Sequence, residues 1–209
     1  IQTGLYTRSP RASPGRPGPQ PQPTMPRIQP IAPETAPAAL KPAFDQIAAK
    51  LGAVPNLMRT FAASPAVLEA YLGFSGALGK ASLSAAEREA IALVVASKNA
   101  CEYCAAAHTA IGKRLAVDAD ELGQNLLGRS RSPRTQALLE LAAEIVEKRG
   151  LVSDASVARL RAAGLGDREL AELVAVVALN LFTNYFNHVA QTALDFPAVR
   201  LPEPALQRG

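Results

Sequence analysis

The chain is poor in the residues that build β-sandwiches, disulfide frameworks and membrane spans. It has no tryptophan, 5% aromatic residues and two cysteines, while its 48% of hydrophobic residues are largely alanine, leucine and valine. That composition favours packed helices, and two cysteines cannot form a disulfide framework. No run of about 18 apolar residues lacks a break or a charge, and no charged-then-apolar leader is visible. These absences predict an all-α protein without a membrane span or a secretory signal, in the cytoplasm.

Acidic residues are absent from the first 24 positions, and this accounts for most of the basic charge. The formal charge is +4 and the pI is near 9.3, but Arg8, Arg11 and Arg16 lie in that stretch, so the charge falls from +4 to +1 without it. Over the remaining residues, acids and bases are interleaved and no basic stripe with aromatics is present. We therefore expect no nucleic-acid partner.

Composition divides the chain into three parts. Residues 1–37 contain ten prolines, which predicts a disordered or extended leader in which Met25 is a natural start. Residues 38–195 are patterned as helices throughout and are numerous enough to bury a full core, so we expect a single helical domain. Residues 196–209 are expected to form a C-terminal tail.

Capping residues and glycines mark the helix boundaries of this domain. Ser84 and Glu87 form a capping-box pattern, and proline follows serine at two further expected helix starts. The expected helices lie at 38–51, 57–63, 65–79, 84–96, 100–115, 118–127, 133–149, 153–163 and from 167 to 179, with helical character continuing towards 194.

The middle and late segments resemble each other after a shift of eighty residues. The match indicates either a duplicated helical hairpin or the chance agreement of leucine and valine patterns, and both interpretations remain open. Under it Glu89 corresponds to Glu169, Leu93 to Leu173, Val94 to Val174, His108 to His188, Cys101 to Leu181 and Cys104 to Asn184.

Both cysteines and one of the two histidines fall in one short stretch. Cys101, Cys104 and His108 would lie within an arc of roughly 60° on a helix, and Asn99 is a plausible N-cap that puts both thiols in its first turn. The helix dipole favours a thiolate there by ~0.3–1 kcal/mol, which lowers a thiol pKa by about one unit or less. A second group is needed to bring the pKa near neutrality, and His108 is the candidate.

Glu89 is the expected partner of His108. A chain reversal near the break at residues 97–99 has its midpoint near Asn99, and the two residues are about equally distant from it along the sequence. The carboxylate would then fix the imidazole tautomer, and His108 could take a proton from Cys104.

Interpretations without a catalytic role remain open for the same residues. The cysteines could be two small buried hydrophobic residues, or zinc ligands together with His108 and one more group. Glu89 could be a solvated helix residue, and either histidine could be a satisfied core residue, an interpretation favoured for His188. Periodicity points Tyr103 away from the thiol face, and its role is undecided.

The arrangement of Glu89 followed by Cys101-Glu-Tyr-Cys-Ala-Ala-Ala-His108 resembles the alkylhydroperoxidase D-like (AhpD-like) branch of the carboxymuconolactone decarboxylase superfamily. Residues 52–59 (GAVPNLMR) and Ser64-Pro65 are similar to its peroxidase-related members. The resemblance covers residues 38–195 and implies an all-helical fold, trimers or hexamers, and no cofactor. It also implies that Cys104 attacks the peroxide, Cys101 resolves, and Glu89 and His108 relay protons.

The sequence departs from the family at one position, because Tyr103 stands where well-studied members have a second histidine. We expect a thiol peroxidase that reduces organic hydroperoxides and is regenerated by an external dithiol or thiol protein. Three alternatives remain: a general thiol–disulfide oxidoreductase, a decarboxylase-like or lactone-processing enzyme that does not use the thiols, and a non-enzymatic helical oligomer.

Overall fold

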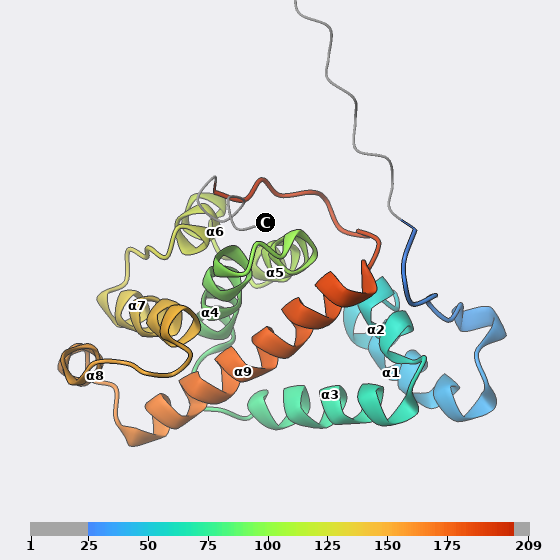
Figure 1. Ribbon diagram of the computed structural model, residues 1–209, viewed down its shortest axis with the longest axis horizontal. Coiled ribbons are helices and arrows are strands. Elements are labelled where there is room, and N and C mark those ends of the chain that lie inside the picture. Colours follow the sequence, from blue (N-terminus) through green and yellow to red (C-terminus); the bar gives the residue numbers. More distant parts are fainter. Residues whose placement is uncertain (1–24, 203–209) are drawn as a thin grey trace, which may run out of the picture.

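A computed structural model describes residues 25–202 of the chain. Within this range the protein consists of α-helices and short 3-10 helices without a β-strand, which confirms the predicted all-α fold (Figure 1). The elements in chain order are η1 (Pro33–Thr35), η2 (Ala38–Leu40), α1 (Lys41–Leu51), α2 (Asn56–Phe61), α3 (Pro65–Leu78), α4 (Ala85–Lys98), α5 (Glu102–Arg114), α6 (Ala119–Leu126), α7 (Pro133–Lys148), α8 (Asp154–Ala162) and α9 (Asp167–Ala190).

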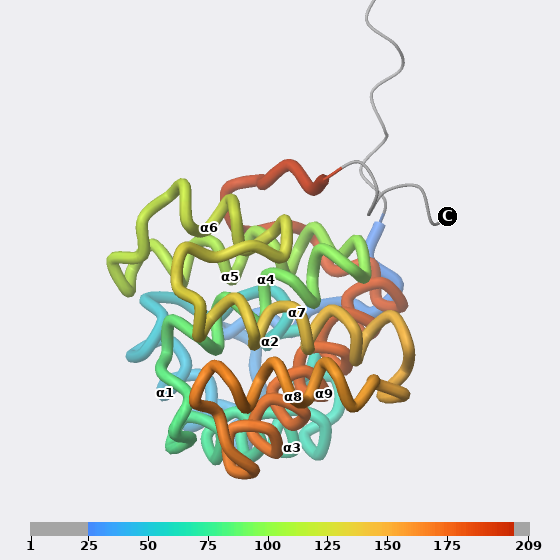
Figure 2. Tube along the Cα trace, turned by 90° about the vertical axis from the view of Figure 1, so that its left-hand side faces the viewer, coloured from blue at the N-terminus to red at the C-terminus, as the bar shows by residue number. Residues whose placement is uncertain are grey.

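Helix α4 is the centre of the fold and packs against α5, α6, α7 and α9. Every residue from Ala90 to Ser97 is buried, so much of this helix has no solvent-facing side. The long helix α9 crosses the molecule beside α4, with α3 running along its other side and α1 and α2 at one end (Figure 1). Figure 2 shows α6, α7 and α8 stacked on the side that faces the viewer.

Buried apolar side chains form two clusters, and α4 contributes to both. One cluster joins α4 to α1, α2, α3, α5 and α6 and contains Cys101 and Cys104. The other joins α4 to α7, α8 and α9. The thiols therefore lie in the half of the core that the N-terminal helices close.

Most helix starts agree with the predicted caps. Ser84 and Glu87 form the complete capping box of α4, and Asp118, Ser132 and Ser153 each accept a backbone hydrogen bond at the start of their helix. Helix α9 is the exception.

Gly166, rather than Asp167, is the N-cap of α9, and the Glu169 carboxylate accepts a hydrogen bond from its backbone N–H at 2.8 Å. The helix also stops before Leu194, because Gln191 adopts a left-handed conformation with φ 52° and ends it after Ala190.

Part of the proline-rich leader is ordered, contrary to the sequence-based expectation. Within residues 25–37, Arg27 N–H donates to the Ala190 carbonyl at 2.8 Å, Ile31 N–H donates to the Arg59 carbonyl at 3.0 Å, and Ala36 is buried. These backbone hydrogen bonds and buried side chains hold residues 25–37 on the domain. The composition of the segment alone could not predict such long-range contacts. Residues 1–24, where the rest of the predicted leader falls, lie outside the described residues.

The first part of the predicted C-terminal tail also packs on the domain. The ring of Phe196 lies edge-on to Tyr103 at 5.7 Å, and Leu201 is buried. The packed body therefore extends beyond the predicted limits of 38 and 195 in both directions. The remainder of the tail, residues 203–209, lies outside the described residues.

Helix α9 bears on two of the predictions. It has the length and apolar composition of a membrane span, but a core helix meets the same criterion, and its Leu173 and Val177 are buried against α4 and α7. It also runs unbroken through the positions equivalent to the break after α4. The second copy of the repeat is therefore one helix, and the interpretation as a duplicated hairpin is wrong for it.

Candidate active site

The chain reverses direction between α4 and α5, at the break expected from residues 97–99. Helix α4 ends at Lys98, and the backbone N–H of Cys101 reaches back to the Ala96 carbonyl at 2.9 Å. Between them Ala100 adopts a left-handed φ of 54°, which costs a residue with a Cβ atom a small amount of strain. The reversal lays α5 against the last turns of α4.

Cys101 is the N-cap of α5, and Cys104 occupies the third helical position. The Cys101 sulfur accepts a hydrogen bond from the Cys104 backbone N–H at 3.4 Å. The prediction that Asn99 is this cap is wrong, because Asn99 ends α4 and the turn uses one further residue before the cap. Cys104 nevertheless lies in the first turn, where the positive end of the helix dipole favours an anionic sulfur.

The two thiols differ in acid strength. A hydrogen bond from the Cys101 thiol lowers the pKa of Cys104 to about 7, against the opposing effect of burial, and the positive charge of His108 acts in the same direction. The pKa of Cys101 is raised, first because it donates that hydrogen bond and then because it is buried. Cys104 is therefore the sulfur that ionises first.

His108 lies one turn beyond Cys104 and pairs with Glu89 of α4. Its Nδ1 is 2.7 Å from the Glu89 Oε2, and the two side chains are 21% and 16% exposed. The contact expected from the chain reversal is thus present. Burial lowers the pKa of His108, but the charge and hydrogen bond of Glu89 together with the charge of Cys104 leave it above its usual value.

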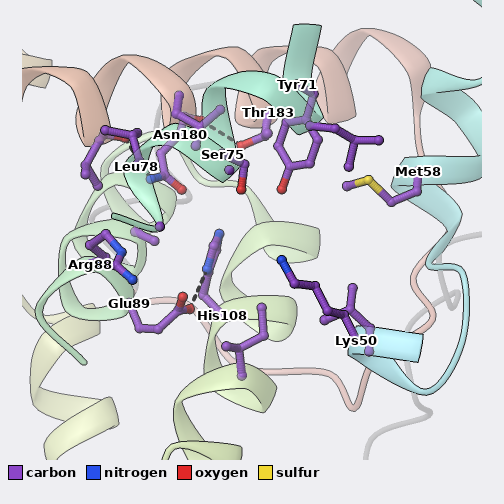
Figure 3. Close-up of a pocket in the computed structure, with 18 of the residues that line it drawn as sticks. Lys50, Met58, Tyr71, Ser75, Leu78, Arg88, Glu89, His108, Asn180 and Thr183 are labelled. Carbon is purple, nitrogen blue, oxygen red and sulfur yellow. Dashed lines mark hydrogen bonds and ion pairs between the residues drawn. The ribbon is translucent and has the colours of Figure 1, made fainter. Parts of the chain in front are cut away.

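A cavity of about 380 Å³ opens beside the Glu89–His108 pair, between α1, α2, α3, α4, α5 and α9. In Figure 3 the imidazole stands in the middle of the view, with Arg88 on one side and Lys50 on the other. Most of the walls are apolar. Besides the pair itself, the polar residues of the lining are Lys50, Tyr71, Ser75, Arg88, Asn180 and Thr183.

Neither cysteine lines this cavity. Both residues are 2% exposed and belong to the buried cluster behind the wall. Cys104 is still within electrostatic reach of that wall. Burial raises the pKa of the wall residue Tyr71 to about 12, and the charges of Glu89 and Cys104 contribute to the rise.

Tyr103 and His188 have structural contacts. The Tyr103 hydroxyl accepts a hydrogen bond from the Leu57 backbone at 3.0 Å, and burial raises the pKa of this phenol. Tyr103 therefore holds α2 against α5 and does not take the place of a second relay histidine. The His188 Nε2 is 2.9 Å from the Asn99 carbonyl oxygen, so His188 ties α9 to the turn that precedes the thiols.

Sequence reasoning missed two amides of α9 that lie at the thiols. Asn187 donates a hydrogen bond from Nδ2 to the Cys104 sulfur at 3.2 Å, and Asn184 is completely buried one turn earlier. The one available signal was the eighty-residue shift, which placed Asn184 opposite Cys104.

The zinc interpretation gains no support from the geometry. Across residues 25–202, no group of three or more His, Cys, Asp or Glu side chains is arranged to hold a metal ion. The cluster of two thiols, one imidazole and one carboxylate is instead suited to proton transfer and to thiol redox chemistry.

Comparison with known proteins agrees with the family resemblance. The model of the carboxymuconolactone decarboxylase family matches residues 65–130, which include α3, α4, α5 and α6. No curated protein matches the sequence.

Several solved structures share the fold. A peroxidase-related protein from Silicibacter sp. TM1040 superposes with a TM-score of 0.74 at 26% identity, over 82% of this chain and 93% of that one. An AhpD-core, peroxidase-related protein from Ralstonia eutropha JMP134 gives 0.71 at 24% identity, over 87% and 95%. The debrominase Bmp8 in complex with 2,3,4-tribromopyrrole gives 0.71 at 19% identity, over 80% and 91%. At their lower identities, the last two show a common fold alone.

Proposed function

We propose that the chain is a thiol peroxidase of the AhpD-like branch of the carboxymuconolactone decarboxylase superfamily, and that it reduces organic hydroperoxides. One observation carries the proposal. A buried thiol of lowered pKa, Cys104, lies one helical turn from His108, which pairs with Glu89 at the wall of a cavity. These groups supply a nucleophile and a proton donor beside a substrate site, and the attack requires the peroxide to pass His108 and reach the Cys104 sulfur behind the cavity wall.

In the first step the Cys104 thiolate attacks the terminal oxygen of the hydroperoxide. A sulfur–oxygen bond forms and the oxygen–oxygen bond breaks, so the sulfur is oxidised and the peroxide is reduced. The alkoxide that leaves takes a proton from the His108 imidazolium and departs as an alcohol. Glu89 stabilises the imidazolium before this transfer, and Cys104 is left as a sulfenic acid.

In the second step the Cys101 thiol attacks the sulfenic sulfur. A disulfide forms, and the hydroxyl group leaves as water with the proton of Cys101. An external dithiol or thiol protein then reduces the disulfide by exchange. Because the disulfide formed in each cycle has to be reduced again, we expect the protein in a reducing compartment, the cytoplasm.

The substrate class follows from the cavity walls. They are mostly apolar, and about 380 Å³ is far more space than hydrogen peroxide needs. Lys50 and Arg88 also line the cavity, and among the described residues neither has a carboxylate partner. We therefore propose an organic hydroperoxide, and expect one that carries an acidic group to bind better than its neutral ester.

Steady-state turnover with a dithiol reductant tests the proposal. Reduction of cumene hydroperoxide should be clearly faster than that of hydrogen peroxide, and should vanish in Cys104→Ser. A preference for hydrogen peroxide would contradict the substrate class, whereas full activity of the variant would contradict the mechanism.

Self-association is part of the proposal, as a trimer or hexamer. Large apolar side chains are exposed on the neighbouring helices α3 and α9, and a second copy could cover them. Light scattering after size-exclusion chromatography would measure the assembly directly. The residues concerned are Phe74, Phe182, Tyr185 and Val189, whose exposed fractions are 39%, 39%, 56% and 63%.

A second candidate function has one observation in its favour, which is that Glu89 and His108 line the cavity whereas the cysteines do not. The pair could then catalyse proton transfer on a bound organic molecule without the thiols, as in a decarboxylase-like enzyme. Such an activity would survive Cys104→Ser and be lost in His108→Ala. A thiol peroxidase would show the reverse, because it would lose all activity without Cys104 but retain a slow thiol reaction without His108.

A further inference from the structure

Helix α9 presents two buried amide side chains to the thiol pair from the far side of the core. The Nδ2 of Asn187 donates to the Cys104 sulfur at 3.2 Å, and Asn187 is only 5% exposed. Its carbonyl oxygen has no hydrogen-bond partner among the described residues. The polar contact of this amide is therefore directed at the sulfur.

The second amide, Asn184, is fixed in orientation by a contact at its oxygen. Asn99 donates from Nδ2 to the Asn184 Oδ1 at 2.9 Å. The Asn184 Nδ2 is buried and has no hydrogen-bond acceptor in the part of the chain that the structure describes. A buried N–H donor without an acceptor lowers the stability of the fold. That cost is offset when a nearby group becomes an anion and accepts the hydrogen bond.

We propose that Asn184 and Asn187 form an amide cradle that holds the Cys104 sulfur as an anion, and that Asn187 is a catalytic residue because it contacts the reacting atom. Two N–H donors from α9 then act on the sulfur together with the first turn of α5. Hydrogen bonds to a charged group are stronger than neutral ones, so the cradle favours the thiolate over the thiol.

The amide cradle also explains the contacts that link the turn between α4 and α5 to α9. Asn99 orients Asn184, and His188 binds the Asn99 carbonyl oxygen at 2.9 Å, so the turn before the thiols and the cradle on α9 are held in register. Asn99, Asn184 and His188 are positioning residues in this arrangement. Asn187, which contacts the sulfur, and then Asn184 lower the pKa of Cys104, after the effects of Cys101 and His108.

The inference rests on the proposed function only in taking Cys104 as the attacking thiol, and it can be measured without any peroxide. Ultraviolet absorbance of the thiolate, followed against pH in the reduced full-length protein, reports the ionisation even of a buried sulfur. In a Cys101→Ser background the signal comes from Cys104 alone, and the serine hydroxyl keeps a donor at that position.

Asn187→Leu should raise the measured pKa of Cys104 by about 1–2 units, the value of one hydrogen bond to a charged group. Asn184→Leu should raise it less, and the double variant most. Asn187→Ala removes the same amide without adding a branched apolar group, and has the same prediction should the leucine variant fail to fold.

Asn125→Leu is the matched control, because Asn125 is an equally buried amide that hydrogen-bonds only within α6 and the loop after it. It should lower the melting temperature without moving the thiol pKa. A folded Asn187 variant whose thiol ionises at the parent pH, or a control that shifts the pKa as much, would overturn the inference even if the protein proves to be a peroxidase.

Discussion

The two copies of the eighty-residue repeat show how one break in a helix creates a site. In the first copy the chain reverses after Lys98, and Glu89 meets His108 at 2.7 Å. In the second copy Glu169 and His188 have the same spacing of nineteen residues, but both lie on the unbroken α9. At ~1.5 Å per residue they are about 28 Å apart and cannot interact.

The residues of the second copy have taken other roles. Glu169 caps α9 through the Gly166 backbone at 2.8 Å, and His188 binds the Asn99 carbonyl. Leu93 and Leu173 are both fully buried, but Val94 is buried while Val174 is 48% exposed, so even the apolar positions of the repeat agree only in part. The comparison shows that spacing alone does not make a relay, because backbone geometry decides which groups meet.

The largest expected effect is at the thiols, which only the first copy has. Cys104→Ser should reduce peroxide turnover to the uncatalysed background, because no nucleophile of comparable strength remains. Cys101→Ser should retain one round of peroxide reduction and stop at the sulfenic acid. Stopped-flow single-turnover measurements distinguish the two, and identical behaviour would contradict the assigned order.

A matched pair of histidine substitutions tests the comparison directly. His108→Ala should lower kcat/KM by about 10²–10⁴-fold, the usual range for a general acid or base, and Glu89→Gln should lower it in the same direction. His188→Ala removes the equivalent residue of α9 and should have a much smaller effect. Equal losses from both alanine variants would show that the relay is not confined to the first copy.

The pH dependence should also reflect the first copy. Since the pKa of Cys104 is lowered to about 7 and that of His108 is raised, kcat/KM should rise through pH 7 as the thiolate forms and fall again at higher pH as the imidazolium loses its proton. In His108→Ala the midpoint should move to higher pH, because the cation that favours the thiolate is gone. A profile whose midpoint does not respond to that substitution would argue against the coupling of sulfur and imidazole.

The smallest effect concerns the break itself. Ala100→Gly should raise the free energy of unfolding by up to about 1 kcal/mol, because a left-handed residue with a Cβ costs ~1–2 kcal/mol and the entropy of glycine returns part of it. Ala178→Gly, within the unbroken α9, should instead lower it by about 1 kcal/mol. Urea denaturation measures both, and the same sign at the two positions would contradict the backbone account.

Local patterns in the sequence were sufficient to predict much of the fold and about half of the candidate active site. The capping box at Ser84, the break after α4 and the meeting of Glu89 with His108 all depend on residues near one another in the chain. The order of residues 25–37 depends on hydrogen bonds to Arg59 and Ala190, which no local pattern records.

The remaining half of the site is tertiary. Asn187 reaches Cys104 across 83 positions of sequence, and an asparagine in the last turn of a helix has no periodicity that marks it as functional. The cavity likewise lies beside the imidazole and away from the thiols because six helices converge there. Such features follow from how helices pack and could not be read from spacing.

The account depends on Cys104 reacting with a hydroperoxide and Cys101 completing a disulfide. Titration of free thiols before and after one equivalent of cumene hydroperoxide, in the wild type and in Cys104→Ser, tests this most directly. We predict the loss of two thiols per chain in the wild type and of none in the variant. Thiols that survive in the wild type, or that disappear in the variant, would contradict it.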